Sequence, residues 1–123
     1  LLKTGGKACI QSIVIRDDLF ARYLDSTDFI QQYIFPGGCL PSPAALRSQA
    51  QAAGLTVVNE IAFGGDYAHT LHQWRAAFHA RRTEVLALGF DERFMRIWDF
   101  YLAYCEAAFR TGDIELVQVT LQK

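Results

Sequence analysis

Three histidines in one stretch have a spacing that first suggests chemistry. His69 and His72 are three residues apart in a segment with helical periodicity, and His79 follows His72 at about two further turns. Imidazoles placed in this way on one helix can share a zinc ion, but such a site needs further ligands. The sequence offers no additional ligand at a suitable spacing. We therefore predict no metal site and regard these histidines as solvated.

Two glycine pairs are the next candidates, because glycine-rich turns hold the phosphates and sugars of nucleotide-derived cofactors. Such a turn has the spacing G-x-G after a strand, with an acidic residue at the end of the following strand. Gly37-Gly38 and Gly64-Gly65 are adjacent pairs without this spacing. We interpret them as turn and helix-end glycines, so these residues predict no cofactor site of their own.

Aromatic and basic side chains in the second half of the chain allow contact with lipid. The aromatic residues can line an acyl channel between helices and a sheet, or they can fill the core. The basic residues can meet lipid phosphates, or they can form an ordinary solvated helix face. The aromatic set is Trp74, Phe78, Trp98 and Tyr101, and the basic set is Arg75, Arg81 and Arg82.

Length and composition limit the class of protein. The 123 residues, 51% of them hydrophobic, suffice for one small domain with a core. A formal charge of -1 gives no field suited to nucleic acid, so we predict no nucleic-acid partner. Three widely spaced cysteines indicate reduced thiols and a cytoplasmic protein. No apolar run can cross a bilayer, so we expect any contact with the inner membrane to be peripheral.

The elements that must position these side chains can be read from periodicity and from capping residues. Short runs rich in branched apolar residues predict strands, and Ser42-Pro43 is a strong helix start. From Tyr67 an apolar stripe predicts one amphipathic helix that ends at Gly89, with Asp66 as its cap, and a second helix runs from Asp91 to Gly112. The expected strands are 8–15, 55–63 and 114–121, and the expected short helices lie within 19–33 and at 43–53.

Residues 29–42, FIQQYIFPGGCLPS, suit neither a plain helix nor a plain strand. Pro36 fixes one backbone angle, and Gly37 and Gly38 permit positive φ, so the chain must turn sharply while its apolar side chains join a core. We predict a structured loop here.

Three motifs carry a resemblance to a known family. They are YIFPGGCLPS at 33–42, GGDYAHTL at 64–71, and FRTGDI at 109–114 followed by Gln118-Val119. With them the chain resembles the C-terminal part of cyclopropane-fatty-acyl-phospholipid synthases and of mycolic acid cyclopropane synthases, which are class I methyltransferases that use S-adenosylmethionine.

The resemblance implies an α/β fold, namely the C-terminal part of a Rossmann-like class I methyltransferase sheet. We expect about three strands, with the last strand antiparallel and central between the other two, and three or more helices. Residues 1–123 would be the C-terminal segment of one methyltransferase domain, and the S-adenosylmethionine-binding part would precede it. This segment alone would be inactive. The strand 8–15 would keep an open edge, which favours a homodimer or a covering loop.

The resemblance also assigns residues to the reaction. In these enzymes a methyl group adds to a carbon–carbon double bond, and a bound bicarbonate removes a proton as the cyclopropane ring closes. Tyr67 matches the family's catalytic, anion-orienting tyrosine, and Gln11 and Ile13 match its His-x-Ile anion-binding pair. An amide can donate a hydrogen bond to an anion, but it cannot become cationic. Whether a ring forms is therefore left open.

We expect the partner to be the acyl chain of a lipid, bound by Tyr33, Phe35, Trp74 and Phe78. Because of Gln11, two related activities remain open, which are methylation of an acyl chain without ring closure and methylation of a small amine. A noncatalytic module for lipid binding or dimerisation is the alternative from another class.

Overall fold

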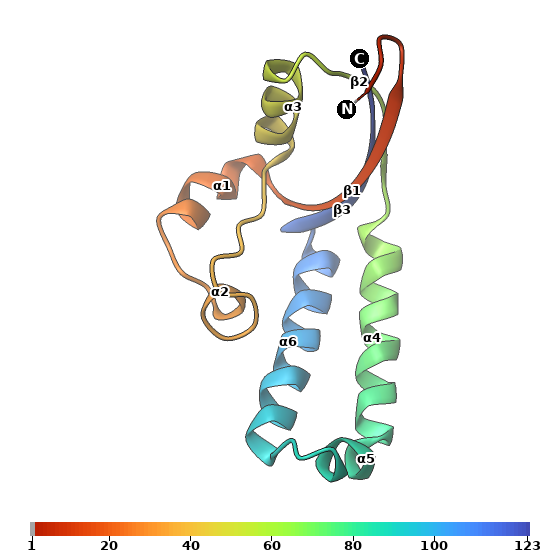
Figure 1. The fold of residues 1–123 in the computed structure, drawn as a ribbon. Coiled ribbons are helices and arrows are strands. Elements are labelled where there is room, and N and C mark those ends of the chain that lie inside the picture. The colour runs from red at the N-terminus through yellow and green to blue at the C-terminus, as the bar shows by residue number, and fades with distance from the viewer. Residues whose placement is uncertain (1) are drawn as a thin grey trace.

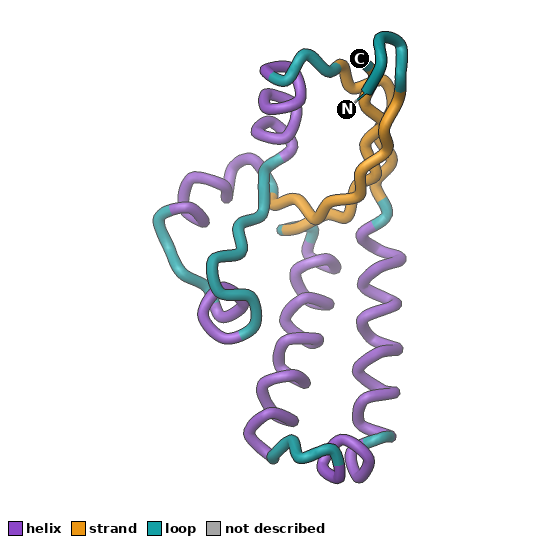
Figure 2. Tube along the Cα trace, viewed as in Figure 1, coloured by secondary structure: helices purple, strands orange, loops and turns teal. Residues whose placement is uncertain are grey.

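The computed structural model describes residues 2–123, in which a three-stranded sheet carries six helices (Figure 1). The tube in Figure 2 shows the same order of strands and helices. The elements are β1 (Lys7–Ile15), α1 (Asp17–Leu24), α2 (Phe29–Tyr33), α3 (Pro43–Ala52), β2 (Thr56–Ala62), α4 (Gly64–Ala80), α5 (Arg82–Ala87), α6 (Glu92–Thr111) and β3 (Ile114–Gln122).

The last strand lies in the centre of the sheet, as the sequence predicted. The strand order is β1-β3-β2, and both pairs are antiparallel. Ile13 lies opposite Leu116 and Gln11 lies opposite Gln118, so each of these pairs shares one face of the sheet. Within residues 2–123, the outer edge of β1 has no partner strand.

The two faces of the sheet belong to two separate groups of buried side chains, because successive strand residues point to opposite sides. Val14, Val117 and Val119 pack with Ala50 of α3 on one face. Ile13 and Leu116 pack on the other face against the end of α6 and the start of α4. Figure 1 shows α4 and α6 running side by side away from the sheet, with α5 at their far ends, where the chain passes from one to the other.

Helix α6 has both of the ends that its sequence predicts. Asp91 accepts a hydrogen bond from the backbone N–H of Phe94 at 2.7 Å, and Gly112 takes the left-handed conformation with φ 75° at the other end. Between them, Arg75 of α4 donates to Asp99 of α6 at 2.6 Å, and this ion pair ties the two helices together.

Two expectations about α4 are wrong. The predicted helix up to Gly89 is interrupted after Ala80, where Arg81 has φ -104° and ψ 20°, because the chain must turn back towards α6. Asp66 does not cap the helix either. It lies in the first turn, and the backbone N–H of Gly64 donates instead to the Glu115 carboxylate of β3. A carboxylate at this helix end is favoured by the helix dipole.

The loop expected at 29–42 is structured by a short helix. Asp28 and Gln31 form a reciprocal capping box at the start of α2, and the Gln31 side chain also donates to the carbonyl of Gly38 at 3.0 Å. However, Tyr33 and Phe35 are 52% and 53% exposed, so these two side chains do not join the core of the described residues.

Candidate functional site

The Tyr67 ring lies in the first turns of α4 and is fixed by aromatic neighbours. Its ring meets Phe109 edge-on at a centroid distance of 5.1 Å and meets Trp74 edge-on at 5.9 Å. These contacts hold the ring against the buried cluster that also packs on Ile13. No residue in the described part of the chain forms a hydrogen bond with its hydroxyl, and since no buried side-chain oxygen there lacks a partner, this hydroxyl is open to solvent or to a ligand.

Burial raises the pKa of three side chains in this region. It raises the pKa of Tyr67 above its ordinary value, and the nearby Cys105 thiol adds to the shift. It also raises the pKa of Tyr101 to about 12 and that of Cys105 to about 11. Because a low-dielectric surrounding disfavours the charged form, all three groups stay protonated at neutral pH. Tyr67 can therefore act there as a hydrogen-bond donor.

Ile13 and Gln11 share the face of β1 that looks towards the α4–α6 hairpin. Ile13 packs against the same buried cluster as Tyr67, whereas Gln11, two residues earlier, is exposed. The Gln118 amide donates to Oε1 of Gln11 at 3.1 Å, which fixes the side chain across the strand pair and leaves the Gln11 NH₂ group free to donate. The structure thus brings Tyr67 and Ile13 together, with Gln11 at the margin.

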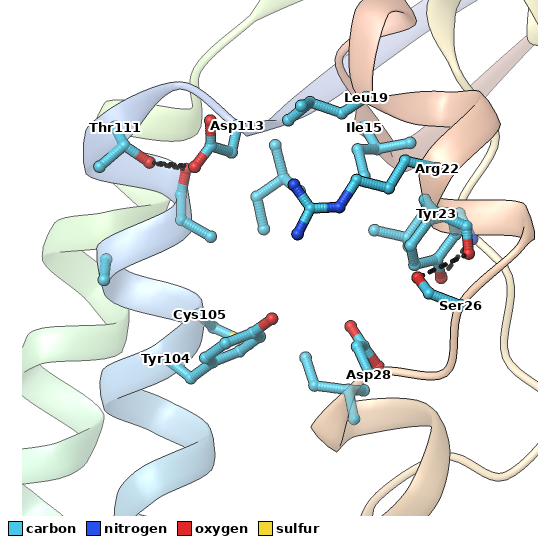
Figure 3. A pocket seen from close by; sticks show the side chains of 15 residues that line it. Ile15, Leu19, Arg22, Tyr23, Ser26, Asp28, Tyr104, Cys105, Thr111 and Asp113 are labelled. Carbon is cyan, nitrogen blue, oxygen red and sulfur yellow. Dashed lines mark hydrogen bonds between the residues drawn. The ribbon is translucent and has the colours of Figure 1, made fainter.

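A cavity of about 510 Å³ lies between α6 and the α1–α2 segment (Figure 3). Its apolar lining includes Ile15, Ile30, Leu40 and Ile114. Cys105 lines the cavity and also belongs to the cluster against which Tyr67 packs, so the cavity and the tyrosine meet at this residue. Such a volume and lining suit a segment of an acyl chain.

One cation and several polar groups stand around this apolar lining. In Figure 3 the Arg22 guanidinium reaches into the cavity, and Tyr23, Ser26, Asp28 and Asp113 lie around it. Asp28 already caps α2, and Asp113 accepts from the Thr111 hydroxyl at 2.9 Å. Arg22 is therefore the charged group of the lining that is free to meet a ligand, within the described residues.

The four predicted substrate-binding residues lie in two separate places, and none of them lines this cavity. Phe35 meets Tyr101 edge-on at 5.9 Å, and Tyr33 lies on Phe29 at 5.4 Å. Trp74 and Phe78 are on α4, where Trp74 is 50% exposed and Phe78 packs on the core.

The Gly64-Gly65 turn does not have the open backbone that would hold the adenosine part of a methyl donor. Gly64-Gly65 does join a strand to a helix, but the Glu115 carboxylate already holds the Gly64 N–H. An added side chain at Gly64 would meet Glu115 and Phe109, so this glycine serves close packing. The Gly64-Gly65 turn is therefore occupied by contacts within the chain.

The histidines have structural partners on α6. His79 Nε2 lies 2.6 Å from Asp99, and His72 Nδ1 lies 3.3 Å from Glu106. Across residues 2–123, no group of three metal-ligating side chains comes together. No helix in this part of the chain is long and apolar enough to cross a membrane.

The sequence alone did not indicate that Arg22 and Leu40 line the cavity, or that Glu115 binds the start of α4. Arg22 and Leu40 lie in the irregular segment around α1 and α2, where periodicity is weak, so no pattern marked them. The role of Glu115 depends on a contact with Gly64, which is 51 residues away in the chain. Only the three-dimensional fold can show such a contact.

Comparisons with known proteins identify the family of this chain. The family model described as mycolic acid cyclopropane synthetase matches residues 1–119. Tuberculostearic acid methyltransferase UfaA1 of Mycobacterium tuberculosis is 42% identical over 122 residues, which are 98% of this chain and 29% of that protein. Cyclopropane-fatty-acyl-phospholipid synthase of Escherichia coli is 41% identical over 102 residues, which are 81% of this chain and 26% of that protein.

A solved structure supports the fold and its class. The crystal structure of mycolic acid cyclopropane synthase CmaA1 complexed with SAH and CTAB superposes with a TM-score of 0.84 at 33% identity, and covers 96% of this chain and 44% of that one. The fold is therefore part of a class I methyltransferase. The chain spans between about a quarter and a third of the curated relatives named above. By its sequence and its fold, the chain belongs to the mycolic acid cyclopropane synthetase family.

Proposed function

We propose that these residues form the acceptor side of a methyltransferase that uses S-adenosylmethionine and acts on unsaturated acyl chains of phospholipids, with formation of a cyclopropane ring. The observation that carries the proposal is the placement of Tyr67. Its side chain packs with Ile13 against one buried cluster, and Cys105 of that cluster also lines the apolar cavity. The methyl donor would then be bound by other parts of the protein.

Tyr67 has the properties needed to hold a small anion beside the reacting carbons. Its raised pKa keeps the hydroxyl protonated, and the edges of Phe109 and Trp74 fix its ring. Bicarbonate held by such a donor can accept the proton that leaves the methylated acyl chain. We propose Gln11 and Ile13 as further anion-binding residues, because they follow one another on the same face of β1.

The acyl chain is proposed to lie in the cavity between α6 and the α1–α2 segment, since its lining is apolar next to Cys105. Phe35 and Phe78 do not line this cavity, and we propose that they contact the part of the acyl chain that continues beyond it, beside Tyr101 and the α4–α6 core. Tyr33 and Trp74 would then lie at the outer ends, where both are half exposed.

A methyl-transfer assay with the whole protein tests this proposal. S-adenosylmethionine with a labelled methyl group is incubated with phospholipid vesicles whose acyl chains are either cis-unsaturated or saturated. We expect label in the unsaturated lipid alone, because the methyl group needs the electrons of a double bond. Equal labelling of both lipids, or of a small amine alone, would contradict the proposed acceptor.

One observation favours a second candidate, which is methylation of the acyl chain without ring closure. Gln11 cannot take up a proton, and UfaA1, a tuberculostearic acid methyltransferase by name, is 42% identical. In this reaction a proton leaves a neighbouring carbon instead of the new methyl group, so the product is branched and unsaturated. Both products gain one CH₂ and have the same mass, so the proton NMR signals of a cyclopropane ring and of an alkene distinguish the two outcomes.

The unpaired edge of β1 is the proposed contact for a homodimer. Backbone N–H and C=O groups along this edge have no partner strand within residues 2–123, and such edges pair readily with other chain segments. Analytical ultracentrifugation of the whole protein tests this: a dimer is expected, and a monomer at all concentrations would contradict it.

A further inference from the structure

One face of the molecule combines exposed aromatic rings with arginines. On α6 the residues Arg93, Arg96, Phe100 and Tyr104 are spaced by three and four, so they follow one side of the helix. Helix α2 adds Phe29 and Tyr33 to the same side, where Phe29 contacts Phe100. We call these six residues the aromatic–arginine face.

The aromatic part of this face is ordered by its own contacts. The Phe29 ring meets Phe100 edge-on at a centroid distance of 4.7 Å, and it lies 5.4 Å from Tyr33. Phe100 stacks on Tyr104 at 5.9 Å. Tyr33 and Phe100 nevertheless remain 52% and 50% exposed. These rings therefore form a fixed apolar surface and do not fill a core.

The arginines of this face have no carboxylate partner. Neither Arg93 nor Arg96 forms an ion pair with any residue from 2 to 123, and both line a shallow hollow of about 230 Å³ with Tyr33 and Phe29. The acidic residues close to them on α6 are already paired: Glu92 binds Arg82, and Asp99 binds Arg75.

The carboxylate near the margin of this face already accepts a hydrogen bond within the chain. Asp28, which lies near Tyr104, accepts the backbone N–H of Gln31 at 2.8 Å as the cap of α2. The two guanidinium groups are thus the charges on this face that are free to bind an external partner. Guanidinium groups bind phosphate oxygens with two parallel hydrogen bonds.

We propose that the aromatic–arginine face docks on a membrane surface that carries anionic phospholipids. Arg93 and Arg96 bind lipid phosphates, and Tyr33, Phe100 and Tyr104 lie at the level of the headgroups, where amphipathic rings are favoured. Exposed rings beside free arginines fit this partner better than a dissolved anion, which would leave the rings in water.

This docking face is different from the basic set predicted on α4. Arg75 is held by Asp99 and Arg82 by Glu92, so two of its three arginines already have partners inside the chain. The proposal also does not depend on methyl transfer, because docking is measured without turnover. A protein that docks but does not methylate would refute the proposed function alone.

Vesicle co-sedimentation of the whole protein tests the proposal. The probes are vesicles of phosphatidylcholine alone and vesicles that also contain phosphatidylglycerol. We expect binding to the anionic vesicles and a loss of about 30-fold in the double variant Arg93→Gln, Arg96→Gln, since each arginine near such a surface contributes about 1 kcal/mol. The single variant Tyr33→Ala should also weaken binding. This loss should persist at high salt, because the ring contributes apolar contact and not charge.

A second double variant provides the matched control. Arg16→Gln with Arg47→Gln removes the same charge, but these arginines are paired with Asp18 and Glu60 away from this face. Its binding should stay within about threefold of the unchanged protein, because exposed ion pairs contribute little. Equal loss in both double variants would overturn the proposal, as would unchanged binding after Arg93→Gln, Arg96→Gln.

Discussion

Gln11 stands where the resemblance places the histidine of the His-x-Ile pair, and our expectation about the product depends on it. Its Oε1 accepts from Gln118, which leaves an NH₂ group that can donate to an anion but cannot carry a proton away. An imidazole at the same place can do both.

The substitution Gln11→His should therefore raise the share of ring-bearing product made by the whole protein. The physical reason is that a cationic imidazole holds the bound bicarbonate more firmly than an amide does, so that the bicarbonate can remove the proton from the new methyl group as the ring closes. Chromatography of the released fatty acids with mass spectrometry measures this share. If both proteins give the same product ratio, Gln11 does not decide the outcome.

Cys105 leads to a prediction about reactivity. Burial raises the pKa of its thiol to about 11 from the ordinary 9.0, so its thiolate fraction at neutral pH is about 100-fold lower than that of an unperturbed thiol. In the folded protein, iodoacetamide should modify Cys105 more slowly than this factor alone predicts, because the side chain is also covered. Peptide mass spectrometry over time checks this, and rapid labelling of Cys105 would show that the cluster opens.

At the level of elements, the α4–α6 hairpin is stabilised by the Asp99 carboxylate. Hydrogen bonds from Arg75, and then from His79, hold the pKa of Asp99 below its ordinary value, although its partial burial acts in the opposite direction. A carboxyl group whose pKa is lower in the folded state stabilises the fold above its unfolded pKa of about 3.9. This contribution is lost as the pH falls through the folded value.

We thus expect Asp99→Asn to lower the free energy of unfolding by about 1–2 kcal/mol at pH 7. The difference from the unchanged protein should shrink when the pH falls below about 4, since protonation then removes the same charge. Urea unfolding at pH 7 and at lower pH measures both effects. A difference that stays constant over this range would contradict the role of the charge.

The end of α6 gives a prediction that separates backbone strain from packing. An added side chain at Gly112 meets nothing within 4 Å, but φ there is 75°, so Gly112→Ala should destabilise the fold by about 1 kcal/mol through strain alone. Gly65 in α4 also has open space and lies in a helix, so Gly65→Ala should be neutral or slightly stabilising. Thermal unfolding compares the two, and equal effects would contradict this explanation.

Local signals in the sequence predicted the ends of several elements. Ser42-Pro43 as a helix start and Gly112 as a stop are both confirmed, because each depends on a few neighbouring residues. The length of α4 and its cap by Glu115 depend on contacts across the fold, and the prediction was wrong at both.

For the whole molecule, the central position of β3 followed from the resemblance and not from periodicity. An alternating pattern such as that of 114–121 indicates a strand but not its neighbours. The candidate functional site was likewise only partly predictable from the sequence. Tyr67 and Ile13 were predicted from motifs, and the structure places them on one cluster, whereas the cavity beside Cys105 is lined from several separate elements and from loops. Its full lining could not be read from the linear sequence.

The central claim is that this segment holds an anion at Tyr67 beside an acyl acceptor, and removal of one hydroxyl tests it most directly. The measurement is the rate of methyl transfer to cis-unsaturated phospholipid by the whole protein and by Tyr67→Phe, at increasing bicarbonate concentration. We predict a loss of kcat on the order of 100-fold, as for the removal of one positioned donor. A higher bicarbonate concentration should also be needed for the half-maximal rate, with the affinity for S-adenosylmethionine and the unfolding temperature unchanged. Activity within twofold of the unchanged protein, with the same response to bicarbonate, would contradict the account.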